Sequence, residues 1–113
     1  MNDQSYPWLI LVPRRESLRE IIDLPDGDQL VLIREIARAS AVLRDLTGAH
    51  KLNVAALGNA VPQLHVHIIA RFAGDPAWPR PIWGVQPPQA FEESAGRAEV
   101  ERLRTALTSP AGQ

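Results

Sequence analysis

The stretch that decides the fold is Gln63-Leu64-His65-Val66-His67-Ile68-Ile69, in which polar and apolar residues alternate before an apolar pair. Because a β-strand repeats every two residues, we expect the side chains of Gln63, His65 and His67 on one face and the apolar ones on the other. A rise of about 3.3 Å per residue would place the two imidazoles roughly 7 Å apart. The pattern predicts a strand over residues 64–71 that presents polar groups from one face.

Two further strands are predicted upstream of this one. Residues 8–12 form a continuous apolar run closed by Pro13, which indicates a strand buried on both faces that lies centrally or is covered. Residues 51–57 predict another strand. The turn residues between positions 58 and 62 suggest that it pairs antiparallel with the strand at 64–71.

Helical spacing of apolar residues predicts a long helix over residues 26–47. Asp26 is the expected N-cap, with Gln29 three residues later, and Gly48 suits the left-handed position that ends a helix. The predicted buried stripe consists of Leu32, Ile33, Ile36, Ala37, Ser40, Leu43 and Leu46. Residues 92–107 predict a second helix, and residues 108–113 a frayed tail.

Between the two predicted helical regions lies a proline-rich tract. Five of the ten prolines fall between positions 76 and 88, together with Trp78 and Trp83, so the tract cannot form a regular helix or a central strand. The elements predict a single α+β domain, with a core over residues 1–75 on which residues 76–113 pack.

Composition limits the possible partners and compartments. The chain has 113 residues, of which 45% are hydrophobic, and its 12 basic and 13 acidic side chains give a formal charge of -1. No global field favours nucleic acid or an anionic membrane. The absence of cysteine excludes disulfides and thiolate metal sites. No apolar run approaches the ~18 residues of a membrane span, so a soluble cytoplasmic protein is expected.

Residues 58–71 resemble the signature of the histidine triad (HIT) superfamily, which is His-x-His-x-His followed by two apolar residues. The upstream strand, helix and strand extend the resemblance over about residues 2–75, with Gln63 in the first triad place, so that the motif is a Gln-x-His-x-His variant. The resemblance implies a HIT-like fold in which an antiparallel sheet carries one long helix and a C-terminal helix. It also implies a homodimer, formed through the central strand and the helix, and predicts that the usual first strand or strands are missing.

The resemblance further implies nucleotide hydrolysis or nucleotidyl transfer. In the family the middle histidine attacks an α-phosphate to give a covalent nucleotidyl intermediate, a role that falls to His65. His67, in the last triad place, binds phosphate oxygens, and Gln63, in the first, supplies a neutral amide for hydrogen bonding as the third catalytic residue. An imidazole with a pKa near ~6.5 is largely neutral and nucleophilic at pH 7. The expected substrates are conjugates of a purine nucleotide, such as dinucleoside polyphosphates or nucleoside phosphoramidates, without a metal or other cofactor.

Three asparagines are candidate substrate ligands under the same resemblance. Asn53 matches a polar residue that the family places near the phosphate on the adjacent strand, and Asn59 lies in the turn that faces the same region. Asn2 is the candidate contact for the ribose. Asn53 and Asn59 could equally satisfy local backbone groups without contacting a substrate.

Other interpretations stay open. Gln63 and Ala60 depart from the family pattern, which favours a nucleotide-binding or regulatory protein without turnover as the alternative function. The His-x-His pair could instead bind a metal with His50 or Asp75. Arg71 and Arg80 are interpreted as solvated edge charges and are left out of the site. Trp78 and Trp83 could lie over the pocket or against a partner subunit, but they are interpreted mainly as residues that pin the proline-rich tract to the core.

Overall fold

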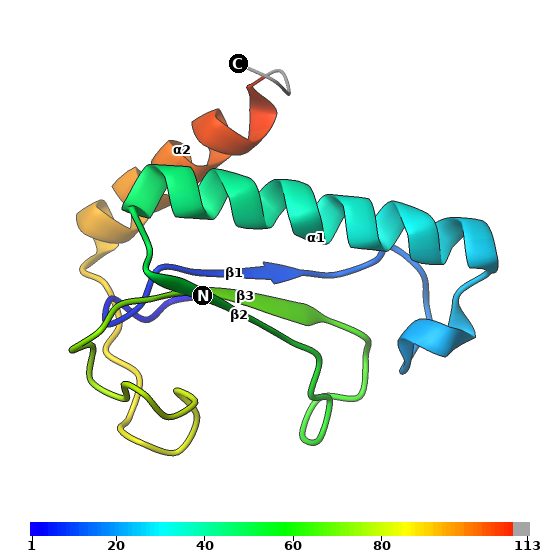
Figure 1. Cartoon of the computed structure of the whole chain (residues 1–113), viewed down its shortest axis with the longest axis horizontal. Coiled ribbons are helices and arrows are strands. Elements are labelled where there is room, and N and C mark those ends of the chain that lie inside the picture. The colour runs from blue at the N-terminus through cyan, green and yellow to red at the C-terminus, as the bar shows by residue number, and fades with distance from the viewer. Residues whose placement is uncertain (110–113) are drawn as a thin grey trace.

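The computed structural model, which describes residues 1–109, shows three strands and two long helices (Figure 1). The elements in chain order are β1 (Trp8–Leu11), the 3-10 helix η1 (Ile21–Asp23), α1 (Asp26–Thr47), β2 (Lys51–Ala55), β3 (Val66–Arg71) and α2 (Glu93–Thr108). The predicted α+β class is confirmed. Both helices fall within one or two residues of their predicted positions.

The strands form one antiparallel sheet in the order β1-β3-β2. The predicted pairing of β2 with β3 is confirmed. The strand predicted over residues 8–12 is present as β1, but it lies at an edge of the sheet and not centrally. The prediction that it is buried on both faces is wrong for Ile10, which is 36% exposed. The central strand is β3, all of whose residues are buried between two neighbours and two covered faces.

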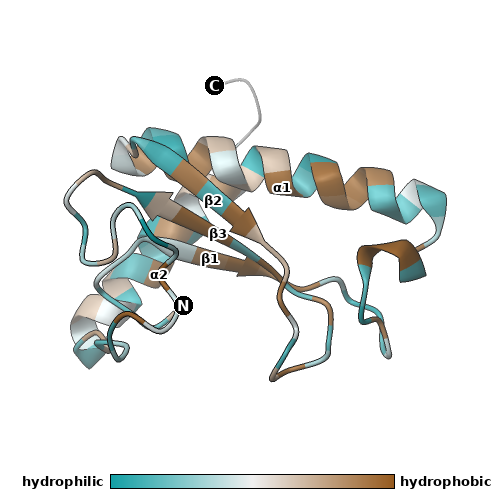
Figure 2. Cartoon of the chain, turned by 60° about the horizontal axis from the view of Figure 1, so that its bottom comes forward, coloured by the Kyte–Doolittle hydropathy of each residue, from teal (hydrophilic) through white to brown (hydrophobic). Residues whose placement is uncertain are grey.

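Helix α1 covers one face of the sheet (Figures 1 and 2). Leu43 and Ile68 are fully buried there, in a cluster completed by Ala39 and Ala70. Each large side chain of this kind stabilises the fold by about 1.5–3 kcal/mol through its burial. Ile33, which the helical pattern placed in the buried stripe, is 58% exposed, because the stripe is wider than the contact with the sheet.

The ends of α1 follow common capping chemistry, except that the N-cap lies one residue before the predicted one. The helix starts at Asp26, so the N-cap position falls on Pro25 and not on Asp26 as predicted. The Gln29 side chain donates instead to the carbonyl of Leu24. Gly48 ends the helix with φ 69°, as predicted, since glycine adopts the left-handed region without steric cost.

The opposite face of the sheet packs against the proline-rich tract. Ala77 and Ile82 of the tract join Tyr6, Trp8 and Ile69 in a second buried cluster. The site described below lies on this face. Helix α2 packs on α1, and Arg38 donates to the carbonyl of Leu107 across that contact.

The predicted frayed tail starts inside α2, where the Thr108 hydroxyl donates to the carbonyl of Arg104. The rest of that prediction, residues 110–113, lies outside the described residues. Within residues 1–109, neither helix has the length and apolar composition needed to cross a membrane.

Candidate active site

The histidine motif crosses the start of β3 and does not form one continuous strand. Strand β3 begins at Val66, and the residue before the first histidine, Leu64, donates its N–H to the carbonyl of Leu18 in the loop after β1. The predicted strand start at residue 64 and the shared face that included Gln63 are therefore wrong. The rings of His65 and His67 meet edge-on, with centroids 5.0 Å apart.

Gln63 acts on His65 through its backbone. Its side-chain amide donates to the carbonyl of Arg15 at 3.0 Å, whereas its own carbonyl lies 2.6 Å from Nδ1 of His65. A carbonyl can only accept, so Nδ1 of His65 carries the hydrogen. The neutral ring then keeps a lone pair on Nε2, which is the form that a nucleophile needs.

His67 lies on β3 and is 7% exposed. Its Nδ1 accepts a hydrogen bond of 3.0 Å from the indole Nε1–H of Trp8 on β1. Burial, followed by the neighbouring His65, lowers the pKa of His67 below its ordinary value. His67 is therefore held in its neutral form over a wider pH range than a solvated histidine.

Trp83 of the proline-rich tract completes an aromatic cluster around His67. Its ring meets His67 edge-on with centroids 5.1 Å apart and meets Trp8 edge-on at 6.0 Å. Such tilted contacts are the favoured geometry between aromatic rings. Trp83 is 37% exposed. Its contact with His67 shows that it does more than pin the tract to the core.

Asn53 of β2 shares the face of the sheet that carries His67. The register pairs Asn53 with Ile69 and Ala55 with His67, and directly paired residues project to the same side. The Oδ1 atom of Asn53 accepts from Nη1 of Arg71 at 2.7 Å. Because arginine only donates, this contact identifies the oxygen of the amide and leaves its NH2 group to donate elsewhere.

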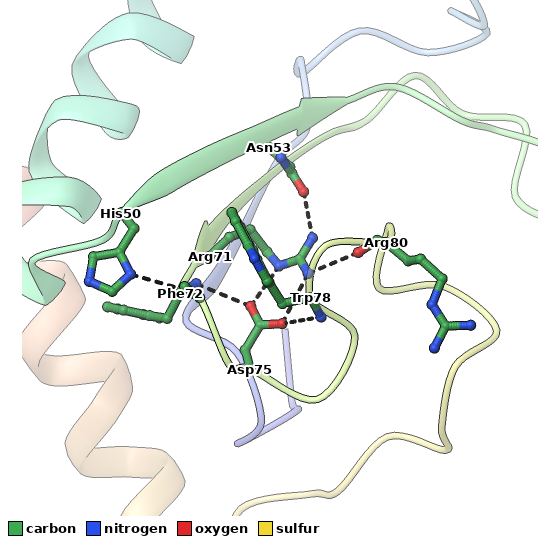
Figure 3. Close-up of polar contacts among 8 residues, drawn as sticks. His50, Asn53, Arg71, Phe72, Asp75, Trp78 and Arg80 are labelled. Atoms are coloured by element: carbon green, nitrogen blue, oxygen red, sulfur yellow. Dashed lines mark hydrogen bonds and ion pairs between the residues drawn. The ribbon is translucent and has the colours of Figure 1, made fainter.

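Arg71 is buried, and the interpretation of it as a solvated edge charge is wrong. The proline-rich tract folds back over the end of β3, so Arg71 is only 1% exposed (Figure 3). Its guanidinium forms an ion pair of 2.7 Å with Asp75, donates to the carbonyl of Arg80 at 2.9 Å, and lies 5.5 Å from the ring centroid of Trp78. Hydrogen bonding to Arg71 lowers the pKa of Asp75 below its ordinary range.

The other predicted substrate ligands differ in their surroundings. Asn59 is exposed in the turn between β2 and β3. The Oδ1 atom of Asn2 accepts from the backbone N–H of Phe91, which ties the first residues of the chain to the segment before α2. The structure therefore places His65 beside His67, with Asn53 on the same face of the sheet as His67. The side-chain oxygen of Asn2 already has a structural partner.

The alternative metal site does not assemble. Asp75 is paired with Arg71, and Nδ1 of His50 accepts from the backbone N–H of Ala73. Among residues 1–109, no three His, Asp or Glu side chains gather into a candidate ligand set.

Sequence reasoning missed the roles of Trp8, Trp83 and Arg71 in these contacts. The position of Trp8 on the same face as His67 follows from the alternation of side chains along paired strands. Once β1 pairs antiparallel with β3 in the observed register, Trp8 projects to the same face as His67. The contacts of Trp83 and Arg71 depend on the path of an irregular tract, for which the sequence has no periodic signal.

Comparisons with known proteins show which family the chain belongs to. The model of the HIT domain matches residues 1–74. A histidine triad protein from Bradyrhizobium japonicum is 52% identical with a TM-score of 0.90, over 95% of this chain and 80% of that one. A histidine triad protein from Marinobacter aquaeolei is 48% identical with a TM-score of 0.91, over 95% and 78%. Another from Sinorhizobium meliloti is 45% identical with a TM-score of 0.90, over 94% and 78%.

No curated protein sequence matches the chain. The domain match and the three solved structures define the class: the chain belongs to the HIT domain family. Proteins of this family are generally hydrolases or transferases with a nucleotide-related function.

Proposed function

We propose that this HIT protein hydrolyses or transfers a nucleotidyl group at the α-phosphate of a nucleotide conjugate, with His65 as the nucleophile. The observation that carries the proposal is the 2.6 Å contact between Nδ1 of His65 and the carbonyl of Gln63. In the neutral ring it places the hydrogen on Nδ1 and the lone pair on Nε2, and in that form the nucleophile needs no separate base.

The proposed reaction has two steps. In the first, Nε2 of His65 bonds to the α-phosphorus while the bond from phosphorus to the leaving group breaks and its electron pair departs with that group. In the second, water attacks the same phosphorus and gives up a proton to the solvent, and the nucleoside monophosphate leaves as the electron pair returns to Nε2. With another acceptor in place of water, the same intermediate gives nucleotidyl transfer.

His67 and Asn53 are proposed to stabilise charge on the phosphate oxygens. His67 is neutral and accepts at Nδ1, so its remaining hydrogen is on Nε2 and can be donated. The NH2 group of Asn53 is a second donor on the same face of the sheet. Preorganised donors of this kind lower the barrier because they need no reorganisation during the reaction.

The proposed substrates are dinucleoside polyphosphates or nucleoside phosphoramidates with a purine base. The cytoplasm is the proposed compartment. We also place the active protein in a homodimer, because α1 and β2 expose large apolar side chains. Leu30 is 60% exposed and Ile33 58%, both on α1, and Val54 on β2 is also exposed. Apolar surface of this kind is typical of a protein contact.

The direct test is turnover of adenosine 5′-phosphoramidate and of diadenosine tetraphosphate, followed by chromatography of released AMP. We expect AMP from at least one of them with the wild type, and loss of at least about 1,000-fold in His65→Ala, because the nucleophile is removed. Parallel calorimetry with AMP measures binding in both proteins. Binding without turnover in the wild type would replace the proposed enzyme by a nucleotide-binding or regulatory protein.

A further inference from the structure

The hydrogen bond between Trp8 and His67 joins two strands within the buried part of the sheet. Trp8 is on β1 and His67 on β3, and both residues are 7% exposed. The indole Nε1 lies 3.0 Å from Nδ1 of the imidazole. Water competes weakly for this bond, and a buried indole N–H left without a partner would carry a desolvation cost.

The bond has a fixed direction. An indole N–H is a donor only, so Nδ1 of His67 must present its lone pair. A hydrogen on Nδ1 would place two N–H groups against each other. The contact therefore opposes both the other neutral tautomer and the doubly protonated ring, and it leaves the ring hydrogen of His67 on Nε2.

The neighbouring His65 is held in the opposite way. Its Nδ1 faces a carbonyl, which requires the hydrogen there, so that in the neutral ring the lone pair lies on Nε2. Two histidines whose ring centroids are 5.0 Å apart thus present different atoms at the same ring position, one a lone pair and the other an N–H. The backbone carbonyl of Gln63 thus makes neutral His65 an acceptor at Nε2, and the indole of Trp8 makes His67 a donor at Nε2.

We infer that Trp8 is a positioning residue that holds His67 as an Nε2–H donor for the phosphate of the substrate. The inference rests on the proposed function for the identity of the ligand, but the tautomer itself is a property of the free protein. Trp83 assists by packing edge-on against both rings, which restricts the rotation of His67.

The first test uses nitrogen NMR of protein labelled with 15N-histidine and 15N-tryptophan. At pH 8 we expect His67 to show an unprotonated Nδ1 and a protonated Nε2, with a coupling from the Trp8 indole nitrogen across the hydrogen bond. A protonated Nδ1 in His67, or no coupling and a rapidly exchanging Trp8 indole proton, would overturn the inference.

The second test is Trp8→Phe, which keeps an aromatic ring and removes the donor. We expect His67 to titrate at a higher pH than in the wild type, and kcat/KM at pH 7 to fall about three- to tenfold, the equivalent of one hydrogen bond. Trp83→Phe is the matched control, because Trp83 touches the same ring without a hydrogen bond to it, and the tautomer of His67 should stay unchanged. An unchanged titration of His67 in Trp8→Phe would contradict the inference.

These measurements separate the inference from the proposed function. If the wild type lacks turnover but His67 shows the expected tautomer and titration, the proposed function fails and the positioning by Trp8 stands. If turnover is present and Trp8→Phe leaves both the tautomer and the titration of His67 unchanged, the proposed function stands and the positioning by Trp8 fails. Circular dichroism at the assay temperature confirms that each variant is folded.

Discussion

Arg71 donates from Nη1 to Oδ1 of Asn53 at 2.7 Å and thereby orients the amide of the neighbouring strand. The same guanidinium is held by Asp75, which comes from the turn that follows β3 (Figure 3). A buried ion pair thus supports a polar residue on the face of the sheet that carries His67. The network links stability to the candidate site.

The ion pair predicts a large loss of stability when one partner is removed. In Asp75→Asn, Arg71 stays charged and buried without its counter-ion, so we expect the free energy of unfolding to fall by about 3–5 kcal/mol in urea titrations. Glu93→Gln is the control, since it breaks an exposed Arg97–Glu93 pair with the same i,i+4 spacing and should change little. Equal effects of the two variants would contradict the buried network.

A substitution of Asn53 distinguishes its proposed contact with the ligand from its contact with Arg71 in the fold. Asn53→Asp retains an oxygen that accepts from Arg71 but replaces the NH2 donor by an anionic acceptor. We expect little change in Tm and a fall in kcat/KM of at least about tenfold, because a hydrogen bond to a charged oxygen is lost and repulsion is added. A lowered Tm with unchanged kcat/KM would assign Asn53 to the fold alone.

The acid dependence of stability follows from His67 and Asp75. The pKa of His67 is lowered from 6.5, so the unfolded chain binds a proton before the native one does, and stability falls as the pH drops below 6.5. The pKa of Asp75 is lowered from 3.8, so its contribution is present above that value and is lost at lower pH. We expect Tm measured from pH 8 to pH 5 to fall less in His67→Asn than in the wild type. Parallel curves would show that the pKa of His67 is not lowered.

A Gln63 variant tests whether the backbone carbonyl or the side-chain amide of the first triad position matters. The carbonyl that orients His65 belongs to the backbone, so Gln63→Ala keeps it and loses only the side-chain bond to Arg15. We expect stability to fall by about 1 kcal/mol and kcat to change by less than about threefold. A loss of activity comparable to that of His65→Ala would show that the side-chain amide takes part directly.

Regular elements were predictable because each carries a periodic signal. The apolar spacing of α1 and the glycine at position 48 fixed the helix and its end, and the alternation after Leu64 identified β3. The placement of β1 failed because an apolar run reports burial and does not tell which neighbour provides it. Packing against an irregular tract on one face buries Trp8, and packing against a helix on the other partly buries Leu9, even at the edge of the sheet.

The site was predictable only in part. The motif singled out His65 and His67 as candidates and the wider resemblance added Asn53, because the chemistry of these residues is apparent from residue type. The partners that set the state of each ring, namely the carbonyl of Gln63 and the indole of Trp8, depend on a backbone bend and on pairing across strands. Arg71 was misassigned because its burial is created by chain that follows it, in the tract around Asp75 and Arg80.

The central claim, a covalent intermediate on His65, is tested most directly by intact mass spectrometry of protein mixed with adenosine 5′-phosphoramidate and quenched within milliseconds. We predict a mass increase equal to one adenylyl group, mapped by peptide fragmentation to His65 and absent in His65→Ala. Wild-type turnover without an adduct at any quench time, or an adduct that persists in His65→Ala, would contradict the account.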